Sequence, residues 1–428
     1  MPKVTVVVVG AGLAGLSAAY SLAKEGIDVL IVERGDYPGS KSITGGRMYF
    51  LPIRDIYPEL WSQAPWERHV VKESLTLLSE HSSLSMEFHN RKYNDQPYHS
   101  FTVLASRFNR WFAQKVTEKG ARIINKYKVD DLILEHGKVK GIVVGGSKIE
   151  ADVVIAADGV MSQMAEKAGL RKKLEPENFA IGVKEVVEIT PESLEKRFGL
   201  GAHEGSARLF LGSLTRGMLG AGFLYTNHDS VSLGIVLGTK DLAHCQQKLA
   251  PYEILEEFKA RPEIATLIQG GVSVEYSAHV LSESGLKGMP RLFGNGIIVV
   301  GDAAGMTMNL GLTVRGMDYA IASGALAARA VVTAKKQEDF SAASLGRYQD
   351  LLKVSFIWKD FTTFRHAPEI LANPRLFGEY PRLACETVEK LMAVGENPKP
   401  KLSSTLFKQL KNRRTLSLVK DMFGMRKI

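Results

Sequence analysis

The stretch Val6-Val7-Val8-Val9-Gly10-Ala11-Gly12-Leu13-Ala14-Gly15 decides the fold of this chain. A β-branched run that passes into glycines is typical of a buried strand. Residues 13–24, rich in Ala and Leu, predict a helix directly after it, and residues 28–32 predict a second strand that closes at Glu33. A Gly-x-Gly-x-x-Gly pattern between strand and helix, with an acid at the end of the next strand, predicts a dinucleotide site.

Each part of this unit has a physical task. The glycines let the backbone approach a pyrophosphate, and the helix N-terminus supplies N–H groups and a positive dipole end. Glu33 is placed to accept hydrogen bonds from ribose hydroxyls. The alternative, a glycine-rich turn without a ligand, leaves the strand, helix and acid unexplained. The predicted contacts here are Gly10, Gly12, Leu13, Ala14, Gly15, Glu33 and Arg34.

Length and composition limit the class of protein. A chain of 428 residues exceeds one ordinary core, so we expect more than one lobe. With 45% hydrophobic and 24% charged residues, the composition excludes disordered and collagen-like chains. No apolar run approaches the roughly 18–20 residues that span a bilayer. Residues 1–10 end in a glycine motif rather than a cleavage site, so we expect a cytoplasmic protein.

Cysteine and histidine usage argues against a metal site on this chain. Cys245 and Cys385 are its two cysteines, whereas an iron–sulfur cluster usually needs about four. Any cluster in the system is therefore expected on a partner. His81, His89 and His99 lack a ligand-like spacing, and we predict no metal site.

The positive charge is concentrated at the C-terminus. Residues 396–428 hold nine Lys or Arg against two acids, a net of +7 out of +9 for the chain. Apolar residues recur among these cations. Such a tail can lie on an anionic membrane or dock an acidic partner, and the alternative is a solvated helix packed on the body. No nucleic-acid motif accompanies the charge, so we predict no nucleic-acid partner.

A second segment, IIVVGDAAG (297–305), separates FAD from NAD. It resembles the second FAD fingerprint of the glutathione-reductase-type flavoproteins. The resemblance implies that Asp302 binds the ribityl chain, that Gly301 also contacts FAD, and that the following helix points its N-terminus at the flavin. No second Gly-x-Gly-x-x-Gly follows a strand, so we expect no NAD(P)H domain. Further FAD contacts that the resemblance implies are Arg107, Val129, Asp158, Gly159, Gly311 and Leu312.

Four segments carry a closer resemblance, and it extends to about residue 380: KSITGGR (41–47), GFLYTN (222–227), VEYSAHV (274–280) and GDAAGMTMNLG (301–311). They resemble the FixC-type flavoproteins, relatives of electron-transfer-flavoprotein:quinone oxidoreductase. Those oxidoreductases carry a C-terminal ferredoxin-like domain with a four-cysteine cluster, which this chain lacks. FixC-type proteins share that lack and are associated with a separate ferredoxin-like subunit.

The resemblance also implies a quinone pocket beside the flavin. It lies near Tyr276 and His279, whose hydroxyl and imidazole would hydrogen-bond quinone carbonyls or relay protons. The alternative is that both side chains only pack. Gly45, Gly46 and Arg47 are expected to run along the flavin, with Arg47 stabilising negative charge on it.

The predicted fold class is α/β: a glutathione-reductase-like, Rossmann-type FAD-binding domain with an inserted antiparallel-sheet lobe and a helical C-terminal tail. The FAD-binding domain covers residues 1–75, 100–180 and 290–345. Residues 76–99 and 181–289 form the quinone or substrate lobe, and residues 346–428 form the C-terminal region with the basic tail.

The function implied by the resemblance is electron transfer through non-covalent FAD. Electrons would pass from an electron-transfer flavoprotein to a quinone, in complex with the ferredoxin-like subunit, on the inner face of the cell membrane. The direction of flow and any electron bifurcation are left open. One alternative is a stand-alone lipid reductase or hydroxylase of the geranylgeranyl-reductase type, and another is a flavin-free structural subunit.

Overall fold

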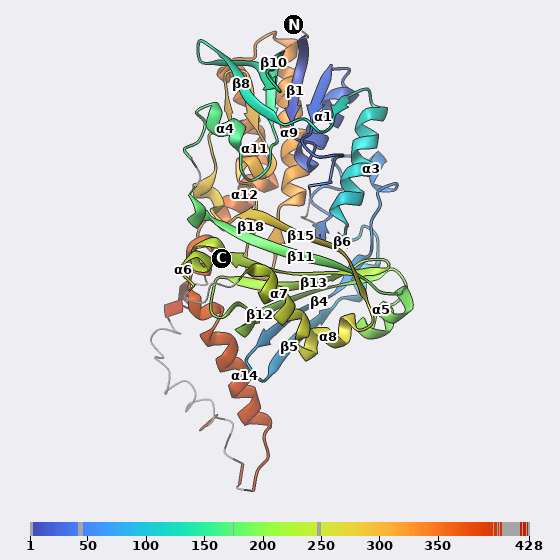
Figure 1. The fold of residues 1–428 in the computed structure, drawn as a ribbon, viewed down its shortest axis with the longest axis vertical. Coiled ribbons are helices and arrows are strands. Elements are labelled where there is room, and N and C mark those ends of the chain that lie inside the picture. Colours follow the sequence, from blue (N-terminus) through green and yellow to red (C-terminus); the bar gives the residue numbers. More distant parts are fainter. Residues whose placement is uncertain are drawn as a thin grey trace.

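The computed structural model describes residues 3–41, 46–173, 175–245 and 250–396, and beyond them 398–399, 401, 403–404, 420–421, 423–424 and 426. Figure 1 shows two sheets, one above the other along the long axis, with a helix that projects from the lower one. Most of the predicted basic tail lies outside the described residues.

The first sheet has eight strands among the described residues. Its centre is parallel, because β7, β2, β1, β10 and β17 all run in the same direction. A meander of β8 and β9 joins β10 antiparallel. The strands, in sheet order followed by the meander, are β16 (Phe293–Gly294), β17 (Ile297–Val299), β10 (Ser147–Ala156), β1 (Lys3–Val9), β2 (Val29–Val32), β7 (Arg122–Ile124), β8 (Val129–Glu135) and β9 (Lys138–Val144).

Helices bury the first sheet, which explains its apolar strands. Residues 6–8 in the centre of β1 are fully buried, as expected of a parallel strand covered on both faces. Helices α1 and α9 approach closely at Gly324, where a Cβ would lie 2.2 Å from the carbonyl oxygen of Ala14. The helices of this half are α1 (Leu13–Lys24), α2 (Pro58–Trp61), α3 (Ala105–Glu118), α4 (Gln163–Lys167), α9 (Met317–Lys336), α10 (Ala342–Leu345), α11 (Arg347–Val354) and α12 (Phe356–Thr363).

The second sheet has nine strands among the described residues and is largely antiparallel. The exception is the pair β4 and β12, which run parallel. One edge of the sheet is β15. The strands are β15 (Val272–Ser282), β11 (Phe179–Glu188), β14 (Ser230–Gly238), β13 (Gly220–Thr226), β12 (Glu204–Gly212), β4 (His69–Leu78), β6 (Ser100–Thr102), β3 (Arg47–Tyr49) and β5 (Ser83–His89).

Helices also cover the second sheet, and the chain then returns along it. Phe258 on α7 packs edge-on against Phe210 of β12, with ring centroids 5.2 Å apart. The remaining helices are α5 (Pro191–Phe198), α6 (Thr239–His244), α7 (Pro251–Ala260), α8 (Pro262–Ile268), α13 (Ala367–Leu371) and α14 (Glu379–Met392). A separate short hairpin consists of β18 (Met308–Asn309) and β19 (Val314–Arg315). Two 3-10 turns also contribute to the site, η4 (Gly285–Gly288) and η5 (Gly301–Ala304).

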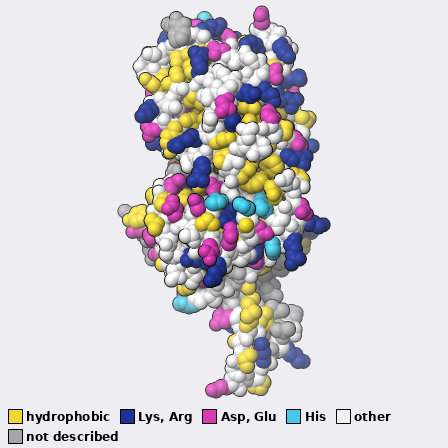
Figure 2. Space-filling model, turned by 90° about the vertical axis from the view of Figure 1, so that its right-hand side faces the viewer, with side chains coloured by type: hydrophobic (Ala, Val, Ile, Leu, Met, Phe, Trp, Pro, Cys, Tyr) yellow, Lys and Arg dark blue, Asp and Glu magenta, His cyan; other side chains and the backbone are white. Residues whose placement is uncertain are grey.

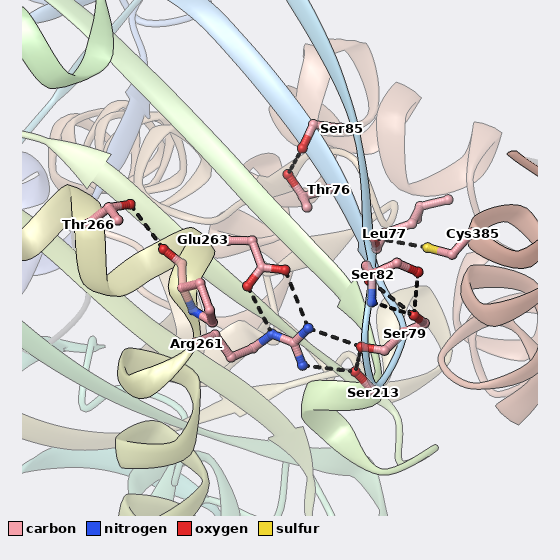
Figure 3. A network of polar contacts seen from close by, with 11 residues as sticks. Thr76, Leu77, Ser79, Ser82, Ser85, Ser213, Arg261, Glu263, Thr266 and Cys385 are labelled. Carbon is pink, nitrogen blue, oxygen red and sulfur yellow. Dashed lines mark hydrogen bonds and ion pairs between the residues drawn. The ribbon is translucent and has the colours of Figure 1, made fainter. Parts of the chain in front are cut away.

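A polar network fastens α14 and the break between α7 and α8 to the end of β4 (Figure 3). Arg261 donates to the carbonyl oxygen of Ser79 at 3.0 Å and to the hydroxyl of Ser213 at 3.2 Å. Cys385 of α14 donates through its thiol to the carbonyl oxygen of Leu77 at 3.4 Å. The start of the C-terminal region is therefore attached to the second sheet.

Several local predictions are confirmed and others need correction. The helix predicted over 13–24 is present. The glycine pair Gly145-Gly146 predicts a hairpin turn, and the structure has one there, between β9 and β10. The sequence of residues 251–269 predicts one helix, whereas the structure has two, because Pro262 cannot donate the hydrogen bond that would continue the first. The expected boundary at residue 75 falls inside β4, and β3 and β6 also pair within the second sheet. The division into domains stays a prediction.

Candidate functional site

A cavity of about 400 Å³ lies between the two sheets. The first sheet and its loops line one side, and strands β11–β15 line the other. Sequence-predicted residues that line it are Gly10, Gly12, Leu13, Ala14, Glu33, Arg34, Gly46, Arg47, Val129, Asp158, Gly159, His279, Asp302 and Gly311. Residues from distant parts of the sequence therefore meet in one place.

The opening glycines fulfil two different requirements. Gly10 has φ +100°, and a Cβ there would lie 2.4 Å from the carbonyl oxygen of Ala157. A Cβ at Gly15 would lie 2.1 Å from the carbonyl oxygen of Gly10, so this glycine lets α1 pack on the strand. A Cβ at Gly12 would meet nothing within 4 Å. Gly10 and Gly15 serve the fold, whereas Gly12 keeps the space in front of α1 open.

Glu33 is held where β2 ends and faces the glycine loop. The side chain is buried, at 8% exposure, which for a carboxylate demands hydrogen-bond partners. The N–H of Ala11 donates to one carboxylate oxygen at 2.8 Å, and the N–H of Gly35 donates to the other at 2.6 Å. Each oxygen has a second lone pair available to a ligand hydroxyl. The acid thus fixes the loop and still faces the cavity.

Asp158 follows β10 and has an unsatisfied oxygen. Its Oδ2 accepts the N–H of Met164 at 3.0 Å, whereas Oδ1 is buried and has no partner among the described residues. Burial raises the pKa of Asp158, although the bond from Met164 opposes the shift. A buried polar atom without a partner is expected to bind a ligand or water.

Asp302 and His279 lie on opposite sides of the cavity and influence each other. Burial raises the pKa of Asp302, and the nearby His279 and the hydroxyl of Thr307 oppose the shift. Burial lowers the pKa of His279, and Asp302 opposes it. Asp302 stands in the short turn η5, and the start of α9 at Met317 also lines the cavity.

Arg47 lines the cavity, but its charge is already matched. It donates to both oxygens of Glu73, at 2.6 and 2.7 Å, and to the hydroxyl of Ser100 at 3.0 Å. The ring of Tyr225 packs on the backbone of Gly46, where a Cβ would lie 2.4 Å from two ring carbons. The segment is therefore tied to β4 and β13.

The wall formed by the second sheet is apolar and rich in glycine. The glycines that line it are Gly182, Gly220, Gly222 and Gly238. One buried cation, Lys184 of β11, lies on this wall and pairs with Glu275 at 3.7 Å. Burial lowers the pKa of Lys184, and Glu275 opposes the shift. A flat wall with a buried amine suits a planar ligand that carries carbonyl groups.

The polar residues of the cavity that were not predicted from the sequence include Lys184, Glu283, Asn309 and Arg315. Asn309 belongs to a segment quoted for the family resemblance, so that segment could have indicated it. The other three are placed at the cavity by strand pairing and by the β18–β19 hairpin, and no local sequence pattern predicts either of these.

Five predicted residues do not line the cavity. Tyr276 lies on the face of β15 opposite to that of His279, because side chains alternate along a strand, and it is 54% exposed. Arg107 of α3 is paired with Glu67 at 3.1 Å, and Leu312 is 60% exposed. Gly15 packs behind the loop, and a Cβ at Gly301 would lie 2.6 Å from the Cβ of Ala14. The predicted Gly45 lies outside the described residues.

The cradle fits FAD. The N-cap of helix α1 is Gly12, which offers no side-chain cap, and the first turn has no acid, so the N–H groups and dipole of the helix remain available to a pyrophosphate. The unsatisfied oxygen of Asp158 and the open space at Gly12 lie on the same cavity. Gly10, Gly12 and the α1 N-terminus would hold the phosphates, Glu33 the ribose and Asp302 the ribityl chain.

Comparison with known proteins agrees with this geometry. Residues 3–197 match the FAD binding domain family, residues 179–281 the ubiquinone-binding domain of ETF-QO, and residues 367–428 the ETF-QO/FixC family C-terminal domain. With the cradle described above, these matches define an FAD-dependent oxidoreductase. In the part of the chain that the structure describes, no group of three or more His, Cys, Asp or Glu could hold a metal ion.

Full-length relatives then give the family. The chain is 43% identical over 420 residues to the probable electron transfer flavoprotein-quinone oxidoreductase YdiS of Escherichia coli K12, covering 98% of this chain and 97% of that protein. It is 42% identical to Protein FixC of Escherichia coli O157:H7, covering 97% and 96%. The chain belongs to the FixC and electron-transfer-flavoprotein:quinone oxidoreductase family.

A solved structure shares the fold at low sequence identity. A geranylgeranyl bacteriochlorophyll reductase-like protein from Thermoplasma acidophilum superposes with a TM-score of 0.73 at 19% identity, covering 99% of this chain and 100% of that one. At this identity the likeness establishes the fold alone.

Proposed function

We propose that this flavoprotein accepts electrons from an electron-transfer flavoprotein and delivers them to a quinone. The observation that carries the proposal is the two-sided cavity, with the dinucleotide cradle on one side and an apolar, glycine-rich wall on the other. The wall belongs to the segment that matches the ubiquinone-binding family. The name of the full-length relative YdiS, a probable electron transfer flavoprotein-quinone oxidoreductase, supports the same donor and acceptor.

The chain's residues bind, orient and shield in this reaction. FAD, when bound, supplies the two-electron chemistry. The glycine loop and Glu33 fix its nucleotide end, and Asp302 fixes the chain that leads to the ring. The second-sheet wall excludes water and admits a flat apolar quinone, to which Lys184 and His279 offer hydrogen bonds.

A partner subunit would supply the iron–sulfur cluster. An iron–sulfur cluster would reside on a separate ferredoxin-like subunit, since the chain has two cysteines, 140 positions apart, and both are free. Among the described residues, no helix is both long and apolar enough to cross a membrane. Figure 2 shows Lys and Arg interspersed with Asp and Glu on one face of the body. The basic tail is therefore the segment we assign to contact with the inner membrane surface or with a partner.

The test uses the full chain loaded with FAD. NADH alone should leave the flavin oxidised, because no second dinucleotide motif follows a strand. A reduced electron-transfer flavoprotein should bleach it, and a soluble ubiquinone analogue should restore the yellow colour. Rapid bleaching by NADH without a partner contradicts the proposal. Reduction of an isoprenoid double bond with no partner present would favour the lipid-reductase alternative instead.

A further inference from the structure

Glu283 is the one carboxyl group in the described part of the chain that lines both the large cavity and a second, much smaller pocket. It directly follows β15 and shares a face of that strand with His279 and Leu281, which also line the large cavity. Its backbone N–H donates to the carbonyl oxygen of Asn178 at 2.9 Å. The side chain thus stands between two spaces, at a position fixed by the backbone.

The second pocket has room for about one water molecule. Its volume is about 10 Å³, at the lower limit for holding one. Its wall extends from Glu283 and Asn309 out to Leu286 on η4 and Pro368 on α13. The residues that follow these two, Lys287 and Glu369, form an ion pair on the exposed surface. The pocket therefore leads from the carboxyl toward the protein surface.

The orientation of Asn309 fixes which atoms face Glu283. The N–H of Gly311 donates to Oδ1 of Asn309 at 2.8 Å, which assigns the oxygen of this amide. The Nδ2 group is then directed to Glu283 and lies 3.4 Å from both carboxylate oxygens. No ion pair among the described residues includes Glu283. Burial raises the pKa of Glu283 to about 7, and the bond from Asn309 opposes the shift without cancelling it.

We infer that Glu283 is the residue that delivers a proton from the surface-facing pocket to the quinone in the cavity. This inference rests on the proposed function. Reduction of a quinone to a quinol requires two electrons and two protons, of which bound FAD in its two-electron-reduced form would supply both electrons and one proton. The second proton comes from Glu283: its O–H bond breaks as an O–H bond forms on the quinone. A proton from the bulk solvent, relayed by water in the second pocket, then restores the carboxylic acid.

The other ionisable groups around Glu283 are less suited to this role. Asp302 faces the flavin side of the cavity, and Lys184 is paired with Glu275. His279 lines the cavity but not the second pocket, so it lacks the outer connection. Charged or titratable residues of the elements around Glu283 that line the large cavity are His279 on β15, Lys184 on β11, Asp302 on η5 and Arg315 on β19. Those next in sequence to residues of the second pocket are Lys287 on η4, Asp360 on α12, and Arg365, His366 and Glu369 at or before α13.

The experiment compares the FAD-loaded wild-type protein with Glu283→Gln, Glu283→Asp and the control Glu188→Gln. The glutamine keeps the size and an acceptor for Asn309 but has no acidic proton. Glu188 is exposed at the end of β11, away from the cavity lining. Each protein is photoreduced without oxygen and mixed with a soluble ubiquinone analogue across a range of pH. A second readout, infrared titration of the carboxylic acid band in the oxidised protein, needs no turnover.

The wild-type rate should fall as pH rises through about 7, because the donor is present only while Glu283 is protonated. Glu283→Gln should react at least about tenfold more slowly and lose this pH step. The infrared band that titrates near neutral pH should disappear with it. Glu283→Asp should retain a pH step, and Glu188→Gln should behave as wild type.

Failure of the proposed function and failure of the role assigned to Glu283 would give different results. A wild type that reduces no quinone overturns the proposed function and this role with it. A wild type that reduces quinone, while Glu283→Gln keeps its rate, its pH step or the titrating band, overturns the assignment of Glu283 alone. A general fall in rate with the pH step intact would mean that Glu283 only supports the wall.

Discussion

The two walls of the cavity are built on different principles. The nucleotide wall is centred on one short loop, in which Gly10 and Gly15 are required by backbone contacts of 2.1–2.4 Å, and segments that follow neighbouring strands complete it. The wall formed by the second sheet gathers single residues from five strands between β11 and β15. A local loop can be recognised in a sequence, whereas an assembled wall depends on pairing between distant strands. Substitutions that separate fold from ligand binding can test this contrast.

The largest effect is expected from Gly15→Val, which should abolish the folded protein. Its Cβ would lie 2.1 Å from the carbonyl oxygen of Gly10 and 3.1 Å from a methyl of Val8, and neither backbone can shift without breaking the packing of α1 on β1. Soluble yield and circular dichroism measure the outcome. A folded Gly15→Val protein would show that the close approach of helix and strand is not essential.

Gly12→Val should give a folded protein without FAD. The N-cap at Gly12 has φ −77° and ψ 177°, which any residue adopts, and its Cβ would meet no atom within 4 Å. The valine side chain would instead occupy the space through which a pyrophosphate approaches the helix N-terminus. We expect the FAD content to fall at least about tenfold at an unchanged unfolding midpoint. Full yellow colour in this variant would refute the assignment of the cradle.

Gly182→Val is the matching substitution in the opposite wall. Its Cβ would lie 3.7 Å from the nearest side-chain atom, in ordinary contact, and valine favours a strand. Because Ala180 and Lys184 line the cavity on the same face of β11, the new side chain would also project into it. We expect normal FAD content and a quinone KM raised by about tenfold. Loss of FAD together with quinone reduction would mean that the two walls do not act separately.

The contrast between the two walls explains which parts of the site could be predicted from the sequence and which could not. The first strand, its helix and Glu33 form a short local unit with glycines at fixed spacing, so residues 6–33 were predictable. Lys184 was not, because burying an amine depends on Glu275, which reaches it through the pairing of β11 with β15. The same pairing explains why Tyr276 and His279, three residues apart, lie on opposite faces.

The smallest effect is expected at the far end of the chain, where Asp421 anchors part of the basic tail. It accepts hydrogen bonds from Arg375 at 2.8 and 2.9 Å and from Asn373 at 2.7 Å, and it contacts Tyr380. The ion pair with Arg375 lowers the pKa of Asp421 to about 2, below the ordinary 3.8. A lowered pKa stabilises the folded state above the ordinary value, and this contribution is lost as pH falls from about 4 towards 2.

Asp421→Asn should therefore lower the free energy of unfolding at neutral pH by about 1 kcal/mol, because Arg375 is partly exposed and solvent screens the pair. The difference from wild type should shrink as the pH approaches 3, and FAD content should stay unchanged, since none of these residues lines the cavity. Urea unfolding at pH 7 and at acid pH, together with a measurement of FAD content, tests this prediction. A variant that loses FAD at pH 7 would show that the C-terminal region supports the cavity, and the tail could not then be assigned to membrane or partner contact alone.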